Sequence, residues 1–208
     1  LASDNLQALT TAQVRALVTA QVSNISTDQI ALLTTKQVQA LSNNQVASLT
    51  SDQLNSMESD DIVAFTTAQI RALTTAQLSD LSSTQTSVME TRDIAALTSA
   101  QATVLSTDAI AALTTDQIKA LTSSALNALT SDQLAAIEVD DLAAMTTAQL
   151  AGMTTLQISK MEVADLAAIT VDQLPKMTTE QIAALTTAQV VALTTDQVSV
   201  LTTAQLAG

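Results

Sequence analysis

An aliphatic or aromatic residue stands at every eighth position of this chain, from Leu1 to Leu201. The 208 residues therefore divide into 26 units of eight (208/8 = 26), and the consensus LTTAQIAA is nearly pure in 185–192. We call each unit an octad and number its positions one to eight, beginning at the aliphatic residue. Because one octad is too small to bury its own apolar side chains, the repeat predicts a solenoid in which units stack on their neighbours.

Two positions of the octad carry the predicted core. Position one is apolar in all 26 octads, and position six is Leu, Ile or Val in all of them except at Thr86 and Ala102. In a continuous α-helix, a period of eight residues would rotate the apolar stripe by about 80° per repeat, and no partner could follow it. In a straight strand the two positions would point to opposite faces. The chain must therefore bend once in every octad.

The polar positions predict where each helix begins. Position two is Ser or Thr in 20 octads and position five is Gln in 19, which is the pattern of a capping box, as in Thr10 with Gln13. Positions one and six then form a hydrophobic staple, as Leu9 and Val14 illustrate. Asp occupies position four in ten octads, where a negative charge favours a helix N-terminus. These signals agree on a helix that begins at position three of each octad.

We therefore predict an all-α fold, in which residues 1–208 form a single tight solenoid of 26 octads without an internal domain boundary. Each octad is expected to be a capped helix of about one and a half turns, with positions one and six facing inward. Position eight is Ala in 14 octads, which indicates a close approach between neighbouring units. Position seven varies freely and is expected to face solvent.

Several octads depart from the consensus. Pro175 at position seven lacks an N–H and crowds the preceding turn, so it predicts a distorted helix. Thr86 and Ala102 thin the core at position six, while Ala109 and Ala125 replace the glutamine of position five. The stretch from 83 to 126 is therefore predicted to be the least stable part of the array.

One substitution is correlated within the chain. The four octads that carry Glu at position two are the same four that carry Asp at position five: Glu58 with Asp61, Glu90 with Asp93, Glu138 with Asp141, and Glu162 with Asp165. The coupling indicates that the two side chains are in contact. One interpretation is an exchange of lengths that fills the same pocket. The other is a Ca²⁺ site at Glu58 and Asp61 or at Glu138 and Asp141, since Ca²⁺ prefers carboxylate ligands.

Position three forms a second polar row, because it is Ser or Thr in 22 octads and is expected to face solvent. Representative members are Thr11, Thr75, Thr147 and Thr203. Solubility explains such a row without any ligand. A regular array of hydroxyl and methyl groups is also compatible with ice binding, and O-glycosylation or weak surface contacts are further interpretations.

The composition excludes most site chemistry. The chain has no His and no Cys, so imidazole catalysis, His-ligated zinc and thiolate nucleophiles are ruled out. With only two glycines it cannot build a phosphate-binding loop. We therefore expect no enzyme activity and no cofactor. The net charge of −13 opposes nucleic-acid binding, and the short apolar runs do not predict membrane insertion.

The recurring phrases LTTAQ and LTTDQ resemble tandem octapeptide tracts of large bacterial exoproteins and surface proteins. The likeness covers all 26 octads but contains no diagnostic functional motif. It implies a spacer or stalk within a longer secreted chain, and hence an extracellular or cell-surface location.

The expected function is a structural repeat module, such as a stalk, spacer or filament-forming segment. The alternative is a binding module that acts through the position-three Thr row or the Glu/Asp octads. The terminal octads are no more polar than their neighbours. The array is therefore expected to self-associate or to continue within a longer repeat array.

Overall fold

The computed structural model describes residues 6–207, so Leu1 and Gly208, which the repeat includes, lie outside the described residues. The described residues form short α-helices and one 3-10 helix. Their bounds are α2 Thr11–Ala16, α3 Thr19–Val22, α4 Thr27–Ile30, α5 Thr35–Ala40, α6 Asn43–Ala47, α7 Ser51–Asn55, α8 Ser59–Ala64, α9 Thr67–Ala72, α10 Thr75–Ser79, α11 Ser83–Ser87, α12 Thr91–Ile94, α13 Ser99–Ala102, α14 Thr107–Ala111, α15 Thr115–Ala120, α16 Ser123–Ala128, α17 Ser131–Ala135, α18 Val139–Ala143, α19 Thr147–Gly152, α20 Thr155–Lys160, α21 Val163–Ala168, η1 Leu174–Lys176, α22 Thr179–Ala183, α23 Thr187–Ala192, α24 Thr195–Ser199 and α25 Thr203–Ala207. Each element occupies one octad, as the repeat predicts.

The helices begin where the capping pattern places them. In the octad of α10, Thr74 is the N-cap with an extended backbone, its hydroxyl accepts from Gln77 N–H at 3.2 Å, and its own N–H donates to Gln77 Oε1 at 2.8 Å. The preceding helix α9 ends at Ala72, and its C-cap Leu73, with φ −57° and ψ 133°, turns the chain into this cap. No residue between 6 and 207 has a positive φ. Position one therefore supplies the bend without a glycine.

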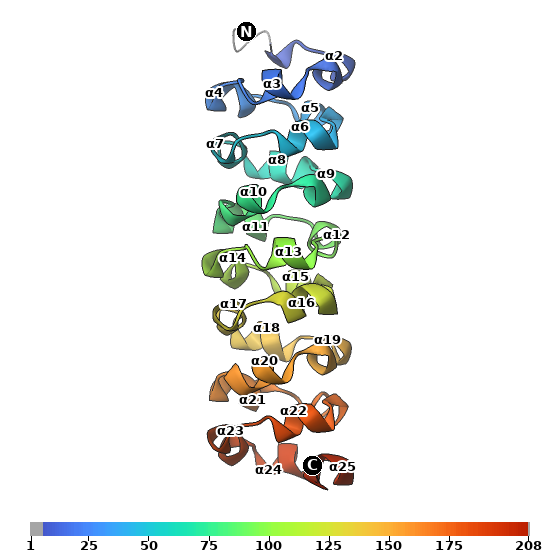
Figure 1. The fold of residues 1–208 in the computed structure, drawn as a ribbon, viewed down its shortest axis with the longest axis vertical. Coiled ribbons are helices and arrows are strands. Elements are labelled where there is room, and N and C mark those ends of the chain that lie inside the picture. Colours follow the sequence, from blue (N-terminus) through green and yellow to red (C-terminus); the bar gives the residue numbers. More distant parts are fainter. Residues whose placement is uncertain (1–5, 208) are drawn as a thin grey trace.

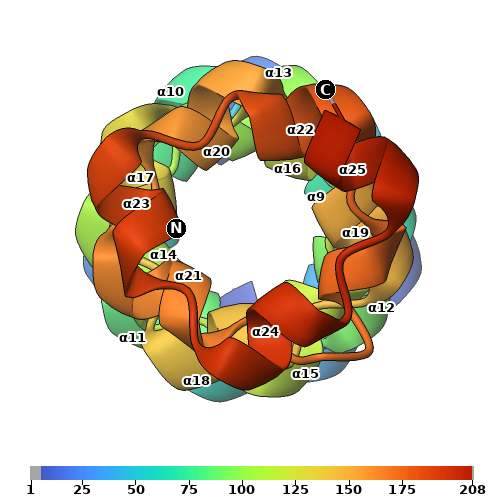
Figure 2. The same cartoon turned by 90° about the horizontal axis from the view of Figure 1, so that it is seen from below.

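Successive octads wind round a common axis and produce a rod with α2 near one end and α25 at the other (Figure 1). Each helix packs against the helix three octads further along, as α10 does on α13 and α13 on α16. In the view along the axis, the successive turns superpose and outline a ring (Figure 2). The two views together show that the superhelix is right-handed. The predicted all-helical solenoid is confirmed.

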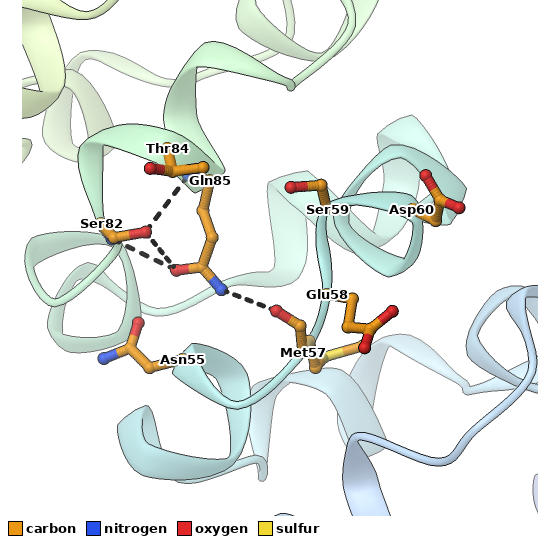
Figure 3. A pocket seen from close by; sticks show the side chains of 8 residues that line it. All are labelled: Asn55, Met57, Glu58, Ser59, Asp60, Ser82, Thr84 and Gln85. Atoms are coloured by element: carbon orange, nitrogen blue, oxygen red, sulfur yellow. Dashed lines mark hydrogen bonds between the residues drawn. The ribbon is translucent and has the colours of Figure 1, made fainter.

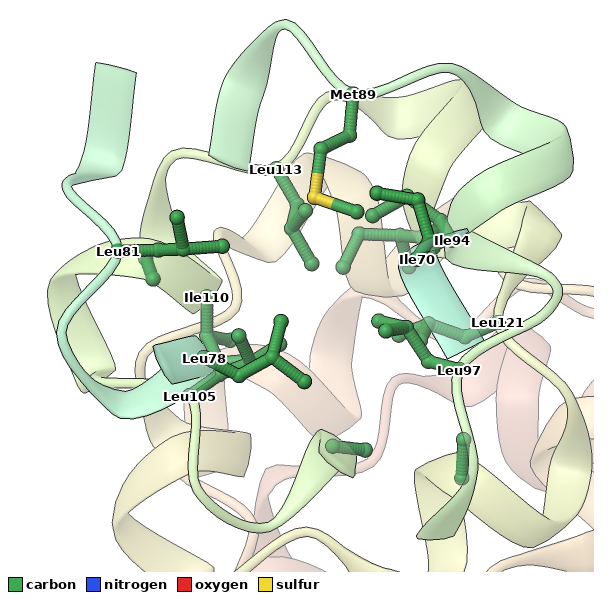
Figure 4. Close-up of a cluster of buried hydrophobic side chains, with 14 of the residues drawn as sticks. Ile70, Leu78, Leu81, Met89, Ile94, Leu97, Leu105, Ile110, Leu113 and Leu121 are labelled. Carbon is green, nitrogen blue, oxygen red and sulfur yellow. The ribbon is translucent and has the colours of Figure 1, made fainter. Parts of the chain in front are cut away.

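Positions one and six fill the interior of the rod. Figure 4 shows Leu78, Ile94, Ile110 and their neighbours directed into one apolar cluster. This cluster runs without interruption from Leu6 to Met177. Full burial of such a side chain contributes about 1.5–3 kcal/mol, so stacking supplies the stability that helices this short lack alone.

The irregular octads behave in different ways. At Pro175 the α-helix is replaced by the 3-10 helix η1, which confirms the predicted distortion. Thr86 and Ala102 are fully buried at position six, and the Thr86 hydroxyl donates to Ser82 O at 3.0 Å. The low stability of 83–126 stays a prediction.

Positions seven and eight also lie where the pattern places them. Arg15, Lys119 and Val191, all at position seven, are exposed. Position eight lies between successive turns: a Cβ added at Gly152 would come within 3.2 Å of Ser123 Cβ. Small residues at position eight therefore allow one turn of the superhelix to approach the next.

Candidate functional site

The glutamine of position five joins each turn of the superhelix to the turn before it. In Gln77 the side-chain oxygen completes the capping box of its own helix, while Nε2 donates to the carbonyl oxygens of Val46 and Leu49, each at 2.8 Å. Those carbonyls lie 31 and 28 residues earlier, at position six four octads back and at position one three octads back. Both the oxygen and the nitrogen of this amide are thus hydrogen-bonded. The separations of 31 and 28 residues place between three and four octads in each superhelical turn.

The same arrangement recurs along the rod, so we call it the glutamine ladder. It is formed by Gln37, Gln45, Gln53, Gln69, Gln77, Gln85, Gln101, Gln117, Gln133, Gln149, Gln157, Gln173, Gln181, Gln189, Gln197 and Gln205. All of them are buried, and among residues 6–207 no buried side-chain nitrogen or oxygen lacks a partner. At the distorted octad, Gln173 reaches Ala143 O in place of the usual position-six carbonyl.

The capping-box pattern predicts the role of the glutamine oxygen but not that of its nitrogen. The signal for the second role was present, because a capping box accepts Glu as readily as Gln, yet no octad of this chain has Glu at position five. A carboxylate can accept but cannot donate when it is ionised. The preference for Gln over Glu therefore reflects the need for a donor between turns.

The Glu/Asp octads lose the donor, and the capping acceptor is kept at Asp61 and Asp165. Glu162 N–H donates to Asp165 Oδ2 at 3.2 Å, which is the bond that glutamine makes elsewhere. Asp93 Oδ1 accepts from the Thr67 hydroxyl at 2.8 Å, and Asp141 Oδ1 accepts from the Thr115 hydroxyl at 2.5 Å. In these two octads the direction of the bond between turns is reversed, because the earlier turn now donates.

Burial raises the pKa of three of these aspartates. Asp61 has only 5% of its surface exposed, and desolvation raises its pKa from 3.8 to about 6, although the Glu58 N–H counteracts the shift. Burial also raises the pKa of Asp93, against the lowering effects of the Thr67 hydroxyl and of Arg92. Asp165 shows the same direction for the same reason. These groups therefore titrate closer to neutrality than ordinary aspartates.

The candidate cation sites are divided between the surface and the interior. Glu58 and Asp60 line an open hollow of about 470 Å³ between α8 and α11, which Figure 3 shows together with Gln85. Asp61 does not line this hollow but is buried, and Asp141 is likewise buried while Glu138 is exposed. Within residues 6–207, no three acidic, histidine or cysteine side chains are grouped as a metal site would require.

The hydroxyl row is exposed as expected. Thr11, Thr75, Thr147 and Thr203 begin α2, α10, α19 and α25 and face solvent. Successive helices lie at different points of the circumference, so the residues of consecutive octads are distributed round the rod (Figure 2). A straight ladder of hydroxyl groups would need residues from octads several units apart.

The family model of the ALTTAQ repeat matches residues 1–35, 54–89, 86–123, 134–159, 158–195 and 184–208. The chain belongs to the ALTTAQ repeat family. The matched segments cover most of the array, and the resemblance to tandem LTTAQ-type octapeptides is confirmed. No curated protein matches this chain. The ALTTAQ repeat of this chain is thus a unit with three contributions to the rod: a cap, a core residue pair and an amide that bonds to the previous turn.

Within residues 6–207, none of the ALTTAQ helices combines the length and the apolar character that crossing a membrane requires.

Proposed function

We propose that this chain is a non-catalytic spacer, a rod that holds whatever lies at its two ends at a defined separation. The observation that carries the proposal is the glutamine ladder, since buried bonds between successive turns repeat from Gln37 to Gln205. Each bond resists both stretching and bending of the superhelix. The proposed setting is the outside of a bacterial cell or its surface, where a stalk of this kind is useful.

The ladder favours a spacer over a binding module. Within residues 6–207 the buried side-chain donors and acceptors are already hydrogen-bonded inside the rod, so they offer little to a ligand. The Thr row lies on a round surface, whereas ice binding requires a flat one, and the acidic pairs do not converge on a common point. The net charge of −13 also opposes binding to the negatively charged backbone of nucleic acid.

A distance measurement tests the spacer. The chain has no cysteine, so spin labels can be attached at cysteines introduced for the purpose. Ala111 and Ala167 are both exposed at position seven and lie seven octads apart, which is about two superhelical turns. The labelled variant with Ala111→Cys and Ala167→Cys should give one narrow distance distribution by pulsed electron paramagnetic resonance.

Inserting seven consensus octads before Leu129 should about double that distance and leave the distribution narrow. The matched control is an insertion of 56 Gly and Ser residues at the same point, which should broaden the distribution because such a linker is a flexible coil. If the octad insertion also broadens the distribution, or leaves the mean distance unchanged, the chain is not a rigid spacer.

A further inference from the structure

The charged residues of the rod are divided between two groups of octads. Six of the seven Lys and Arg residues stand in the octads of α2, α5, α9, α12, α15 and η1, and all six are exposed. The octads of α4, α7, α8, α10, α14, α17, α18 and α21 contain no Lys or Arg but hold thirteen of the twenty acidic residues. The six cations are Arg15, Lys36, Arg71, Arg92, Lys119 and Lys176.

The fold brings each group to one side of the rod. In the view along the axis, α9, α12 and α15 lie on the right of the ring, and α10, α14, α17, α18 and α21 lie on the left (Figure 2). In the view from the side, α2 and α5 lie on the right and α4 and α7 on the left (Figure 1). The helix η1 packs on α19, which is on the right in both views. We call these the basic side and the acidic side; α8 and α18 form the border of the acidic side, since they pack on α5 and α15.

The charges of the two sides are balanced differently. Only four carboxylates stand in the octads of the basic side, and one of them, Glu90, pairs with Arg92 at 2.9 Å. Among residues 6–207, Arg92 is the only Lys or Arg in an ion pair. Arg15 instead donates from Nε to Ala40 O at 3.4 Å. The basic side therefore presents exposed cations without a carboxylate partner, and the acidic side presents carboxylates without a cation.

We propose that copies of this chain associate side by side, with the basic side of one rod against the acidic side of the next. The occupant is a second copy because each side supplies the charge that the other lacks. The two sides differ and lie across the ring from each other, so every pair leaves one basic and one acidic side open. The association therefore gives rows of rods rather than closed dimers. The contact lies on the flanks of the rod and does not involve its ends.

Screening decides whether this contact can form. The net charge of −13 repels two copies at long range. At an ionic strength of about 0.15 M the Debye length is ~8 Å, whereas the outer surfaces of the two sides are separated by at least two helices of ~10 Å diameter each. Each side then interacts with the surface directly opposite and little with the far side of its neighbour. Exposed ion pairs contribute little individually, so the contact is weak and needs several cations together.

Sedimentation velocity over a range of protein concentrations and salt concentrations tests the proposal. At about 0.01 M salt the Debye length is ~30 Å, so whole molecules repel each other and association should be weakest. Association should be strongest near about 0.15 M salt and should fall again at about 1 M, where a Debye length of ~3 Å weakens the facing pairs. An apolar contact would show no such loss at high salt.

Two lysines provide a matched pair of variants for the basic side. Lys36 is on α5, whereas Lys160 ends α20, which packs on α17 of the acidic side; both are exposed. Replacing either with Glu makes the net charge two units more negative. Lys36→Glu should weaken association about threefold to tenfold, and Lys36→Glu with Arg71→Glu should leave monomers. Lys160→Glu should not weaken association.

The acidic side is tested by Asp52→Lys with Asp132→Lys. Both aspartates are exposed at position four, where Lys36 shows that the octad accepts a lysine. This variant is less negative overall, so general repulsion between copies falls, yet association should weaken because the acidic side is the contact. A mixture with the Lys36→Glu, Arg71→Glu variant should recover association, since each variant retains the side that the other needs. Circular dichroism should show that all variants remain helical.

Several results would overturn the proposal: a chain that is monomeric at every concentration and salt, association that persists undiminished at about 1 M salt, an equal loss with Lys160→Glu, or stronger association with the Asp52 and Asp132 substitutions. The inference goes beyond the spacer, and the two can fail separately. A monomeric chain with a narrow 111–167 distance would keep the spacer and refute the lateral contact. Lateral association of a chain with broad distances would do the reverse.

Discussion

The octads of α10 and α8 have the same architecture but use different side chains at the same buried position. Gln77 and Asp61 are 3% and 5% exposed. Gln77 accepts within its own helix and donates to the previous turn, whereas the shorter Asp61 accepts from Glu58 N–H and has no amide to donate. The comparison separates two requirements of position five. Starting the helix needs only an acceptor, and bonding to the earlier turn needs a donor.

The largest expected effect comes from making the glutamine octad resemble the acidic one. Gln77→Glu keeps the capping oxygen but removes the donor to Val46 and Leu49 and places a charge beside their carbonyls. We expect the free energy of unfolding to fall by about 2–4 kcal/mol at pH 7, measured by urea denaturation. Gln13→Glu is the matched control, since Gln13 makes the capping-box bond and its amide donates to no other turn within residues 6–207, and it should change stability by less than about 0.5 kcal/mol. Equal losses in the two variants would refute the separation of roles.

The second effect is a dependence of stability on pH. The pKa of Asp61 is raised in the folded chain from 3.8 to about 6, so between these values the folded state binds more protons than the unfolded state. Stability should therefore rise as the pH falls from 7 toward 4, by about 1–3 kcal/mol. Asp93 and Asp165 act in the same direction.

The melting temperature measured between pH 7 and pH 4.5 checks this dependence. Asp61→Asn should raise the melting temperature at pH 7 and flatten its rise on acidification. Asp196→Asn is the control, because Asp196 is exposed and its substitution removes the same charge from the surface. If the two variants give parallel pH curves, the dependence belongs to the overall charge and not to the buried group.

A third effect, of about 1 kcal/mol, concerns the coupling between Glu58 and Asp61. Replacing both with the consensus pair, Glu58→Thr with Asp61→Gln, restores the hydroxyl cap and the donor together. Each single substitution leaves one partner mismatched, so the double variant should be more stable than the sum of the singles predicts, by about 1 kcal/mol. A double-mutant cycle in urea measures this term, and strict additivity would show that the correlated substitution has another origin.

The smallest effect adds a missing donor to the stretch from 83 to 126. Ala109 stands where the ladder has glutamine, and Ser106 already caps its helix. Ala109→Gln should add about 0.5–1.5 kcal/mol by reaching the carbonyls of Leu78 and Leu81. Amide hydrogen exchange should show slow exchange spreading through 83–126 in the variant, whereas in the unmodified chain this stretch should exchange faster than 129–166. Destabilisation would mean that the buried alanine leaves no space for the longer side chain.

The sequence predicted those features that depend on residues within one octad. The caps at Thr10 and Thr74, the inward positions one and six, and the distortion at Pro175 all follow from contacts over at most five residues. The number of octads per turn and the handedness could not be predicted, because they depend on how a turn fits against the turn 28 to 31 residues earlier.

The candidate site could be predicted only in part, because it too depends on how one turn packs against the next. The correlated Glu and Asp indicated a special position, but their separation into exposed Glu58 and buried Asp61 depends on packing by the neighbouring turns. The interturn bond of the glutamine ladder was missed, although the preference for Gln over Glu pointed to it. A repeat that prefers Gln to Glu at a capping position is therefore worth testing for a second partner far away in sequence.

The spacing of the ladder bonds bears on how such a gene can change in length. Loss or gain of one complete octad by unequal recombination shifts every later glutamine by one octad. Each amide then still lies opposite position-six and position-one carbonyls, because every octad supplies the same ones. A deletion of one or two codons within the array would instead offset all the bonds that cross that point. The architecture thus tolerates duplication and contraction in steps of 24 nucleotides. Related genes can therefore encode rods of different length without any compensating substitution.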